Sequence, residues 1–81
     1  MAQNFKTQDI KEHMEVLGSD GQHVGTVDHL EGADKIKLAK NDPTAGGKHH
    51  FIPTAWIDHV DKHVHLNKSV NDATQQWQAA A

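Results

Sequence analysis

Residues 14–30 read MEVLGSDGQHVGTVDHL, which is an apolar segment, a polar turn and a second apolar segment. The turn contains residue types that favour tight turns: Gly18, Asp20 and Gly21. Glycine adopts positive φ angles without strain, and an aspartate side chain hydrogen-bonds nearby backbone N–H groups. We therefore predict a β-hairpin with strands over Met14–Leu17 and about Val24–Glu31.

The second of these strands carries a break in its alternation. Val24 and Val27 are three positions apart, so a regular strand would direct them to opposite faces. A bulge at Gly25 would return both valines to one face and bend the strand, as a small barrel requires. The pattern therefore indicates a curved sheet.

Further short strands separated by turns follow along the chain. They are predicted at Lys35–Ala39, His49–Ile52 and Lys62–Asn67. Ile36 and Leu38 alternate with lysines and are expected to face the core. Pro53 ends its strand, because proline has no N–H to donate to a ladder. A polar loop over Lys40–Lys48 and a helical turn over Thr54–Ile57 connect these strands.

One domain accounts for the 81 residues, and a chain of this length buries only a small core. Ser69 and Asp72 resemble a capping box at the start of a final helix. The fold class that we predict is mostly β: a small, partly open antiparallel barrel of about five to six strands with a short C-terminal α-helix. Its parts are a flexible N-terminus at 1–7, the barrel at 8–68, the helix at 69–78 and a frayed tail at 79–81.

The charge pattern argues against several classes of partner. The net charge is −3, and all eight basic residues are lysines. Proteins that bind nucleic acids usually carry a basic stripe, often with arginine, so we expect no nucleic-acid partner. No apolar run approaches the roughly 20 residues of a membrane helix, and the N-terminus does not resemble a secretory leader. We therefore expect no membrane insertion. The absence of cysteine fits a reducing compartment, so we also expect a cytoplasmic location.

Several short motifs are shared with a known superfamily. They are Met14-Glu15-Val16, Gly18-Ser19-Asp20-Gly21, Val24-Gly25-Thr26-Val27 and Ile52-Pro53 with Trp56-Ile57. With these motifs the chain resembles the PRC-barrel superfamily over about residues 8–68, most closely its short stand-alone bacterial members of a domain-of-unknown-function family. His13 stands where such domains often have glycine. The resemblance implies a docking module without catalytic residues, as related barrels are in the photosynthetic reaction-centre H subunit and in a ribosome maturation factor.

Histidine is the unusual residue of this chain, with eight copies. His63 and His65 alternate on a predicted strand and would project to one side about 6.6 Å apart, where two imidazoles can hold one metal ion. A third ligand is available from His49 and His50 on another predicted strand, or from the intervening loop, which carries Asp58, His59 and Asp61. The competing interpretation places His63 and His65 on the solvent face, opposite Val64 and Leu66, with no physiological metal.

The other motifs that suggest chemistry are incomplete. Gly46-Gly47-Lys48 lacks the upstream glycine and the following serine or threonine of a phosphate-binding loop. Asp58 and Asp61 flank His59 on a predicted exposed turn, where solvated caps are the simpler interpretation. Because none of the usual catalytic constellations is complete, we expect neither enzymatic activity nor a cofactor.

These observations predict a non-catalytic protein-interaction module of unknown partner that associates with itself as a homodimer. Its contact residues are expected on the helix stripe and beside the barrel: Trp77, Val70, Thr74 and Trp56. A small barrel has little core, and dimerisation buries more apolar surface. The alternative is a histidine-based metal-binding or pH-responsive protein, whose net charge would change sign near about pH 6 as the histidines take up protons.

Overall fold

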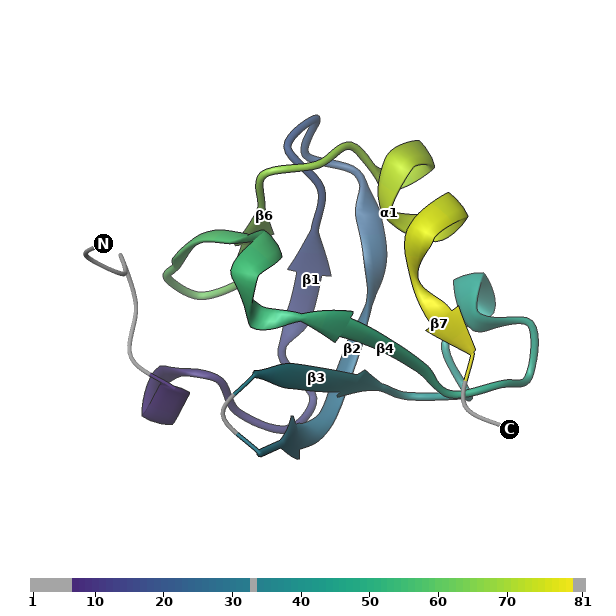
Figure 1. The fold of residues 1–81 in the computed structure, drawn as a ribbon, viewed down its shortest axis with the longest axis horizontal. Coiled ribbons are helices and arrows are strands. Elements are labelled where there is room, and N and C mark those ends of the chain that lie inside the picture. The colour runs from purple at the N-terminus through teal and green to yellow at the C-terminus, as the bar shows by residue number, and fades with distance from the viewer. Residues whose placement is uncertain (1–6, 33, 80–81) are drawn as a thin grey trace.

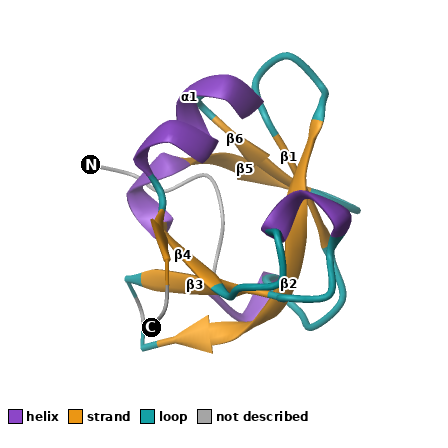
Figure 2. Cartoon of the chain, turned by 90° about the vertical axis from the view of Figure 1, so that its right-hand side faces the viewer, coloured by secondary structure: helices purple, strands orange, loops and turns teal. Residues whose placement is uncertain are grey.

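The strand β2, His23–Glu31, is long and bent and joins two halves of one sheet (Figure 1). The computed structural model describes residues 7–32 and 34–79. Within these ranges the other strands are β1 Glu15–Leu17, β3 Lys35–Leu38, β4 His50–Pro53, β5 Ile57–Val60, β6 Val64–Leu66 and β7 Gln78–Ala79. Their order across the sheet is β5-β6-β1-β2-β3-β4-β7. One half contains β5, β6 and β1, the other contains β3, β4 and β7, and β2 pairs in both (Figure 2).

The sheet is mixed and open, which corrects the predicted antiparallel barrel. β1 pairs with β2 antiparallel but with β6 parallel. Among the described residues no ladder joins the outer strands β5 and β7. The parallel pair arises because the chain crosses from β4 to the far side of β1 before it forms the β5–β6 hairpin, so that β6 runs in the same direction as β1. The prediction of a mostly β fold with one short C-terminal helix is confirmed.

A bulge beside Gly25 interrupts β2, as the sequence predicts. The ladder between β1 and β2 shifts register at Val16 and Leu17, so that Val24 is an extra residue on β2. Both Val24 and Val27 are buried, at 0% and 1% exposure. A second register shift lies farther along β2, where it pairs with β3. These two irregularities allow one strand to bend and to take part in both halves.

Two strands are missing from the sequence-based prediction. β5 includes residues that the sequence predicts as an exposed turn, and β7 begins within the predicted helix. β6 is shorter than predicted because residues 61–63 form the hairpin turn, where the Asp61 N–H donates to the His63 carbonyl at 3.0 Å. Single turns of 3₁₀ helix lie at η1 Thr7–Asp9, η2 Pro43–Ala45 and η3 Thr54–Trp56. Most of the predicted flexible N-terminus and the end of the predicted tail, residues 1–6 and 80–81, lie outside the described residues.

The turn before β1 passes through His13, whose φ is 69°. This is the left-handed region that favours glycine. The His13 N–H donates to the Val27 carbonyl at 2.8 Å, which holds the turn against β2. The position at which the PRC-barrel resemblance implies glycine therefore has a backbone conformation suited to glycine.

The helix α1, Val70–Gln76, packs against β2 and begins as predicted. The Ser69 hydroxyl accepts a hydrogen bond from the Asp72 N–H at 3.2 Å, which caps the first turn. Ala73 is fully buried under the helix. The helix ends earlier than predicted because Trp77 is extended, with φ −66° and ψ 158°. No helix in the described part of the chain has the length and apolar character of a membrane span.

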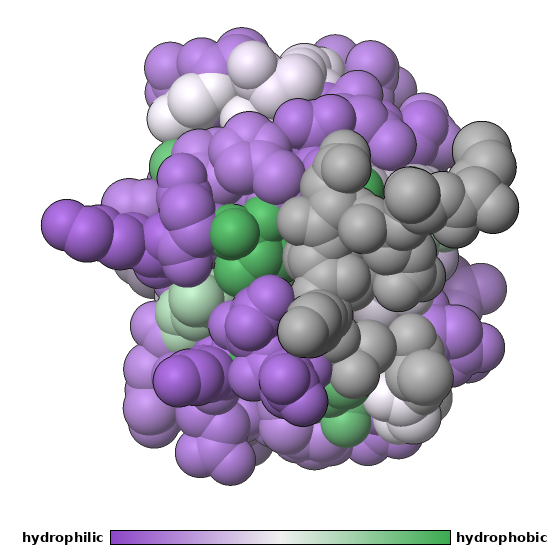
Figure 3. All heavy atoms as spheres, turned by 90° about the vertical axis from the view of Figure 1, so that its left-hand side faces the viewer, coloured by the Kyte–Doolittle hydropathy of each residue, from purple (hydrophilic) through white to green (hydrophobic). Residues whose placement is uncertain are grey.

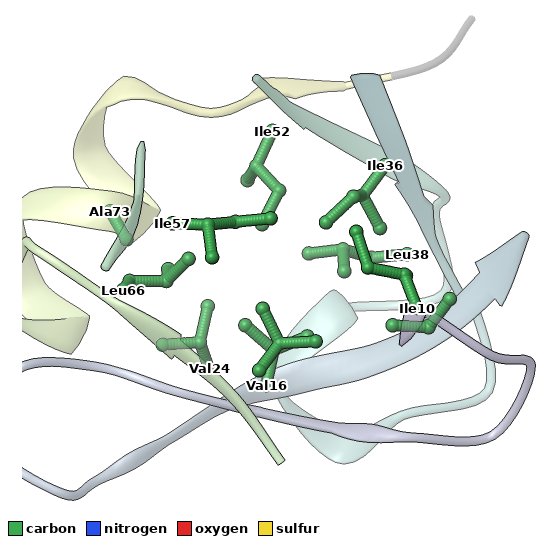
Figure 4. Packing of buried hydrophobic residues seen from close by; sticks show 11 residues of the cluster. Ile10, Val16, Val24, Ile36, Leu38, Ile52, Ile57, Leu66 and Ala73 are labelled. Carbon is green, nitrogen blue, oxygen red and sulfur yellow. The ribbon is translucent and has the colours of Figure 1, made fainter. Parts of the chain in front are cut away.

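The core lies between the two halves of the sheet and under α1 (Figure 4). Its members come from the segment after η1, from β1 to β6 and from α1: Ile10, Val16, Val24, Val27, Ile36, Leu38, Ile52, Ile57, Val64, Leu66 and Ala73. Ile36 and Leu38 face inward, as their alternation with lysines predicts. The same alternation directs the intervening side chains to the outer faces, where the candidate sites lie.

Candidate functional site

A groove lined by aromatic and apolar side chains lies on the outer face of β3 and β4. We call it the aromatic groove, and its lining residues are Lys35, Phe51, Ile52, Pro53, Trp56, Gln76 and Gln78. Its volume is about 280 Å³. Phe51 and Pro53 alternate with the buried Ile52 along β4, so strand geometry directs both away from the core. Trp56 follows in η3 and packs partly against the core.

Lysine ammonium groups lie over both aromatic rings of this groove. The Lys35 Nζ is 5.9 Å from the centre of the Phe51 ring, and the Lys68 Nζ is 5.3 Å from the centre of the Trp56 ring. Both distances suit cation–π contacts. The aromatic groove is therefore apolar at its floor and positively charged at its rim.

A second site lies on the β5–β6 hairpin, where His59, Asp61 and His65 meet. We call these three residues the hairpin cluster. His59 and His65 are direct neighbours across the ladder, and their rings stack with centres 4.2 Å apart and planes 11° apart. Asp61 lies in the hairpin turn, with Oδ1 2.8 Å from the His65 Nε2 and Oδ2 3.9 Å from the His59 Nε2. One ligand atom from each residue lies within 4.8 Å of the other two.

Neighbouring groups hold the hairpin cluster in position. The Asp58 Oδ2 lies 2.7 Å from the His59 Nδ1, and the His63 N–H donates to the Asp61 Oδ1 at 2.9 Å. This backbone hydrogen bond is the main cause that lowers the pKa of Asp61; slight burial opposes it and the nearby His65 adds to it. A hollow of about 430 Å³ adjoins the two imidazoles, and its lining residues are Gly18, Ser19, Gly21, Asp58, His59, His65, Leu66 and Asn67.

The rings of His63 and His65, which are two positions apart in the sequence, do not point to one common site. Their rings meet edge to face, with centres 6.1 Å apart and planes at 89°. The His63 Nε2 lies 3.4 Å from the Glu15 Oε1, whereas the His65 Nε2 lies against Asp61. Of the histidines named as possible ligands, the structure brings His59 and His65 together across two strands.

A buried carboxylate ties the long polar loop to the sheet. The Asp42 side chain is 3% exposed, and its Oδ2 lies 2.7 Å from the His23 Nε2 and accepts a hydrogen bond from the Thr26 hydroxyl at 2.7 Å. The other ring nitrogen of His23, Nδ1, lies 2.7 Å from the Glu15 Oε2. Burial lowers the pKa of His23, but the hydrogen bonds and charges of Glu15 and Asp42 outweigh burial, and the net pKa is raised. This arrangement favours the imidazolium, which donates from both nitrogens.

The histidines of the fourth strand lie far along the sheet from the hairpin cluster. His50 belongs to β4, and His49 precedes it; β4 is separated from β6 by β1, β2 and β3. The His49 Nδ1 donates to the Leu38 carbonyl at 3.0 Å. The His50 ring is buried and stacks on Trp77, with centres 3.9 Å apart and planes 14° apart. The third group beside His59 and His65 is thus Asp61, and neither His49 nor His50 reaches it.

The burial of His50 predicts a loss of stability in mild acid. Burial, followed by the charges of Lys48 and His49, lowers the pKa of His50 below its usual 6.5. The unfolded chain then takes up this proton first, so stability is retained above pH 6.5 and is lost as the pH falls through the folded pKa. We expect His50→Phe, which retains the stack on Trp77, to reduce this loss in urea unfolding between about pH 6.5 and 5.

The same substitution is expected to raise stability at neutral pH by up to about 1 kcal/mol. The reason is that the His50 Nδ1 is buried with no hydrogen-bond partner among residues 7–32 and 34–79. His49→Phe is the control, because the Nδ1 of His49, unlike that of His50, has a hydrogen-bond partner, the Leu38 carbonyl. If His50→Phe loses as much stability below pH 6.5 as the wild-type chain does, His50 is not the cause of that loss.

The residues predicted for protein interaction fall in two places. Trp77 and Val70 pack against the core of their own chain, and the Thr74 hydroxyl donates to the Val70 carbonyl at 2.9 Å. Trp56 lines the aromatic groove. The helix stripe is therefore largely used within the chain, whereas Trp56 in η3 lines an open groove beside β4.

Several site residues are missed by reasoning from the sequence. Phe51 could have been found, since a residue next to the inward-facing Ile52 points away from the core. Asp61 is not missed: the sequence offers it as a possible third ligand on the loop between the strands, but its approach to the two imidazoles depends on the β5–β6 register. Asp42 carries no local signal of burial, because it lies in a loop of polar residues, glycine and proline.

The fold and the two sites define a small, mostly β domain with an exposed aromatic groove and a histidine-rich hairpin. The chain belongs to the DUF2171 family, described as an uncharacterized protein conserved in bacteria, whose model matches residues 10–74. The matched part runs from Ile10, the first core residue, into α1. This match supports the expected bacterial domain of unknown function. No curated protein matches the chain.

Proposed function

We propose that this protein is a non-catalytic interaction module that associates with a second copy of itself through the aromatic groove. The observation that carries the proposal is the position of Phe51, Pro53 and Trp56 around one groove on an outer face of the sheet. Aromatic side chains in a groove are the usual anchors of protein interfaces, because they bury a large apolar area with few rotatable bonds. The resemblance to PRC-barrel docking modules, which stays a prediction, points to the same class of function.

The charges beside the groove favour a second copy as the occupant. Glu31 pairs with Lys35 across the β2–β3 ladder, and the exposed Asp34 is adjacent in sequence. One face therefore carries both signs of charge next to an apolar floor. A symmetric dimer brings the same patch of both copies together, so it requires this kind of self-complementary surface. In such a contact, lysines of one copy face carboxylates of the other.

The small size of the domain also favours self-association. Eleven buried apolar residues of the described chain form one cluster between the two halves of the sheet (Figure 4). A domain of this length gains stability when a partner covers further apolar surface. Burial of Phe51 and Trp56 against a second copy supplies such surface without any change in the core.

Sedimentation velocity over a range of concentrations tests this proposal. We expect the wild-type chain to dimerise and Phe51→Ala to raise the dimer dissociation constant about 10- to 30-fold, which corresponds to roughly 1.5–2 kcal/mol. Phe51 lies on the outer face of β4, so its truncation leaves the core unchanged. Trp77→Ala is the comparison variant: it truncates an aromatic ring that stacks on His50 of its own chain and does not itself line the groove, although its neighbours Gln76 and Gln78 do.

Each outcome of this comparison has a distinct meaning. Dimerisation that is weakened by Phe51→Ala and not by Trp77→Ala supports the groove. The opposite result places the interface at Trp77 and refutes Phe51 as its anchor. A wild-type chain that stays monomeric up to its solubility limit removes the second copy as the occupant and leaves the groove to a different protein.

A further inference from the structure

The geometry of the β5–β6 hairpin brings two imidazoles to one point on the sheet edge. β5 is an outer strand, and its pairing with β6 places His59 directly opposite His65. Side chains at directly opposed positions share one face of the sheet, so both rings project the same way and stack at 4.2 Å. The pair depends on the ladder register and not on any spacing within one strand.

The hairpin turn adds a carboxylate to this pair. Asp61 lies two residues after His59 and four before His65, and its two oxygens face the Nε2 atoms of the two rings at 3.9 and 2.8 Å. The hydrogen bond from the His63 N–H fixes the Asp61 side chain in this direction. Two imidazole nitrogens and one carboxylate oxygen therefore converge within 4.8 Å.

Asp58 orients one of the imidazoles from behind. Its Oδ2 lies 2.7 Å from the His59 Nδ1, so this nitrogen carries the proton and the lone pair is left on Nε2, on the side of Asp61. A carboxylate on the far nitrogen of a ligating histidine is the usual outer partner of metal-bound imidazoles, since it fixes the tautomer and makes the ligand more basic. This contact is an observation independent of the three converging groups.

We propose that His59, Asp61 and His65 form a binding site for a divalent transition-metal ion such as Zn²⁺. Zn²⁺ accepts imidazole nitrogen and carboxylate oxygen at about 2.0–2.2 Å and commonly takes three protein ligands with a water molecule in the fourth position. Tetrahedral ligands at this distance are about 3.3 Å apart, so binding breaks the hydrogen bond between Asp61 and His65 and splays the two stacked rings. Imidazole ligands disfavour Mg²⁺ and Ca²⁺, which prefer all-oxygen sites.

The position of the hairpin leaves the metal open to solvent and to an exchangeable ligand. The hairpin projects at the left of Figure 1, on the side of the molecule that Figure 3 shows to be mostly hydrophilic. The hollow next to His59 and His65 is partly lined by the polar residues Ser19 and Asn67. None of the three ligands lines the aromatic groove, so this proposal does not depend on self-association.

Calorimetric titration of the full, untagged chain with Zn²⁺ at pH 7.5 tests the site. We expect one ion per chain, and we expect His65→Ala and Asp61→Asn each to raise the dissociation constant at least about 100-fold. Asp58→Asn, which leaves all three ligands in place, is expected to weaken binding about 10- to 100-fold through the orientation of His59. Co²⁺ gives a second readout, because its visible absorption reports the coordination geometry. Circular dichroism of each variant without metal confirms that the fold is retained.

His63→Ala is the matched control, because His63 adjoins His65 but lies against Glu15 and outside the cluster. Its binding should equal that of the wild-type chain. The proposal is overturned if His63→Ala loses Zn²⁺ as His65→Ala does, or if the cluster variants bind as tightly as wild type. Phe51→Ala separates the two proposals: it should lose dimerisation and keep Zn²⁺, so failure of one leaves the other testable.

Discussion

Gly18→Ala is expected to destabilise the folded chain by about 3 kcal/mol, as overpacking against backbone does. A methyl group at this position would lie 2.7 Å from the Val70 nitrogen and 3.0 Å from the Lys68 carbonyl oxygen. Both neighbours are backbone atoms at the start of α1, so neither can rotate away. Relief of the clash requires the turn after β1 to separate from the helix, which would strain the hydrogen bond from the Ser19 N–H to the Lys68 carbonyl at 2.8 Å.

Thermal unfolding followed by circular dichroism measures this effect. For a domain of this size a loss of 3 kcal/mol lowers Tm by roughly 12–24 °C. Gly21→Ala in the same turn is the control: nothing lies within 4 Å of the added carbon, and the only cost is its φ of +77°, which is about 1 kcal/mol. Equal losses in the two variants would show that the turn conformation, and not the contact with α1, makes glycine necessary at position 18.

The contrast between these two glycines shows what could be predicted from the sequence. Both are recognisable as turn residues, and Gly21 has the positive φ that the pattern suggests. Gly18 is necessary for a different reason, its contact with Val70, which is distant in the sequence. Local patterns therefore predict where the chain turns, and they do not reveal which distant segment packs against a turn.

The same limit explains the errors in the sheet. Alternation identifies β3 and β4 well, because Ile36, Leu38 and Ile52 alternate with outward-facing residues. β5 is missed because a register shift lies between Ile57 and His59, so its apolar residues do not alternate. The parallel pairing of β1 with β6 is set by the path of the chain across the core, and no short sequence motif predicts that path.

The candidate sites depend on the same long-range contacts. The histidines are evident from composition, but the convergence of His59 and His65 requires the ladder between β5 and β6. The aromatic groove likewise requires Gln76 and Gln78, near the C-terminus, to lie beside Phe51 of β4. The residue types and much of the secondary structure can therefore be predicted from the sequence, whereas the tertiary fold determines which side chains meet in each candidate site.

His23→Leu is expected to destabilise the chain by about 2 kcal/mol at pH 6.5, because it removes a hydrogen-bond donor from a buried carboxylate. Asp42 then retains the Thr26 hydroxyl but loses the ring nitrogen at 2.7 Å. Leucine has a volume close to that of histidine, so the loss reports the polar contact and not a cavity. Urea unfolding at fixed pH measures it.

The pH dependence of this contact has a definite sign. The pKa of His23 in the folded chain lies above 6.5, since the contacts with Glu15 and Asp42 outweigh burial. The folded chain therefore takes up the proton before the unfolded chain does. The stabilisation is complete below pH 6.5 and is lost as the pH rises through the folded pKa. Wild-type stability should thus fall as the pH rises above 6.5, and His23→Leu should flatten this fall.

His29→Leu provides the matched control for this experiment. His29 also lies between two carboxylates, Asp28 and Glu31, and hydrogen bonding to Glu31, opposed by slight burial and aided by Asp28, raises its pKa. Its partners are exposed, however, so salt screens the contact and its loss should change the stability little. In about 1 M salt the fall in stability above pH 6.5 should persist in His29→Leu and disappear in His23→Leu. If salt abolishes the fall in the wild-type chain as well, Asp42 and His23 do not form a buried proton-dependent contact.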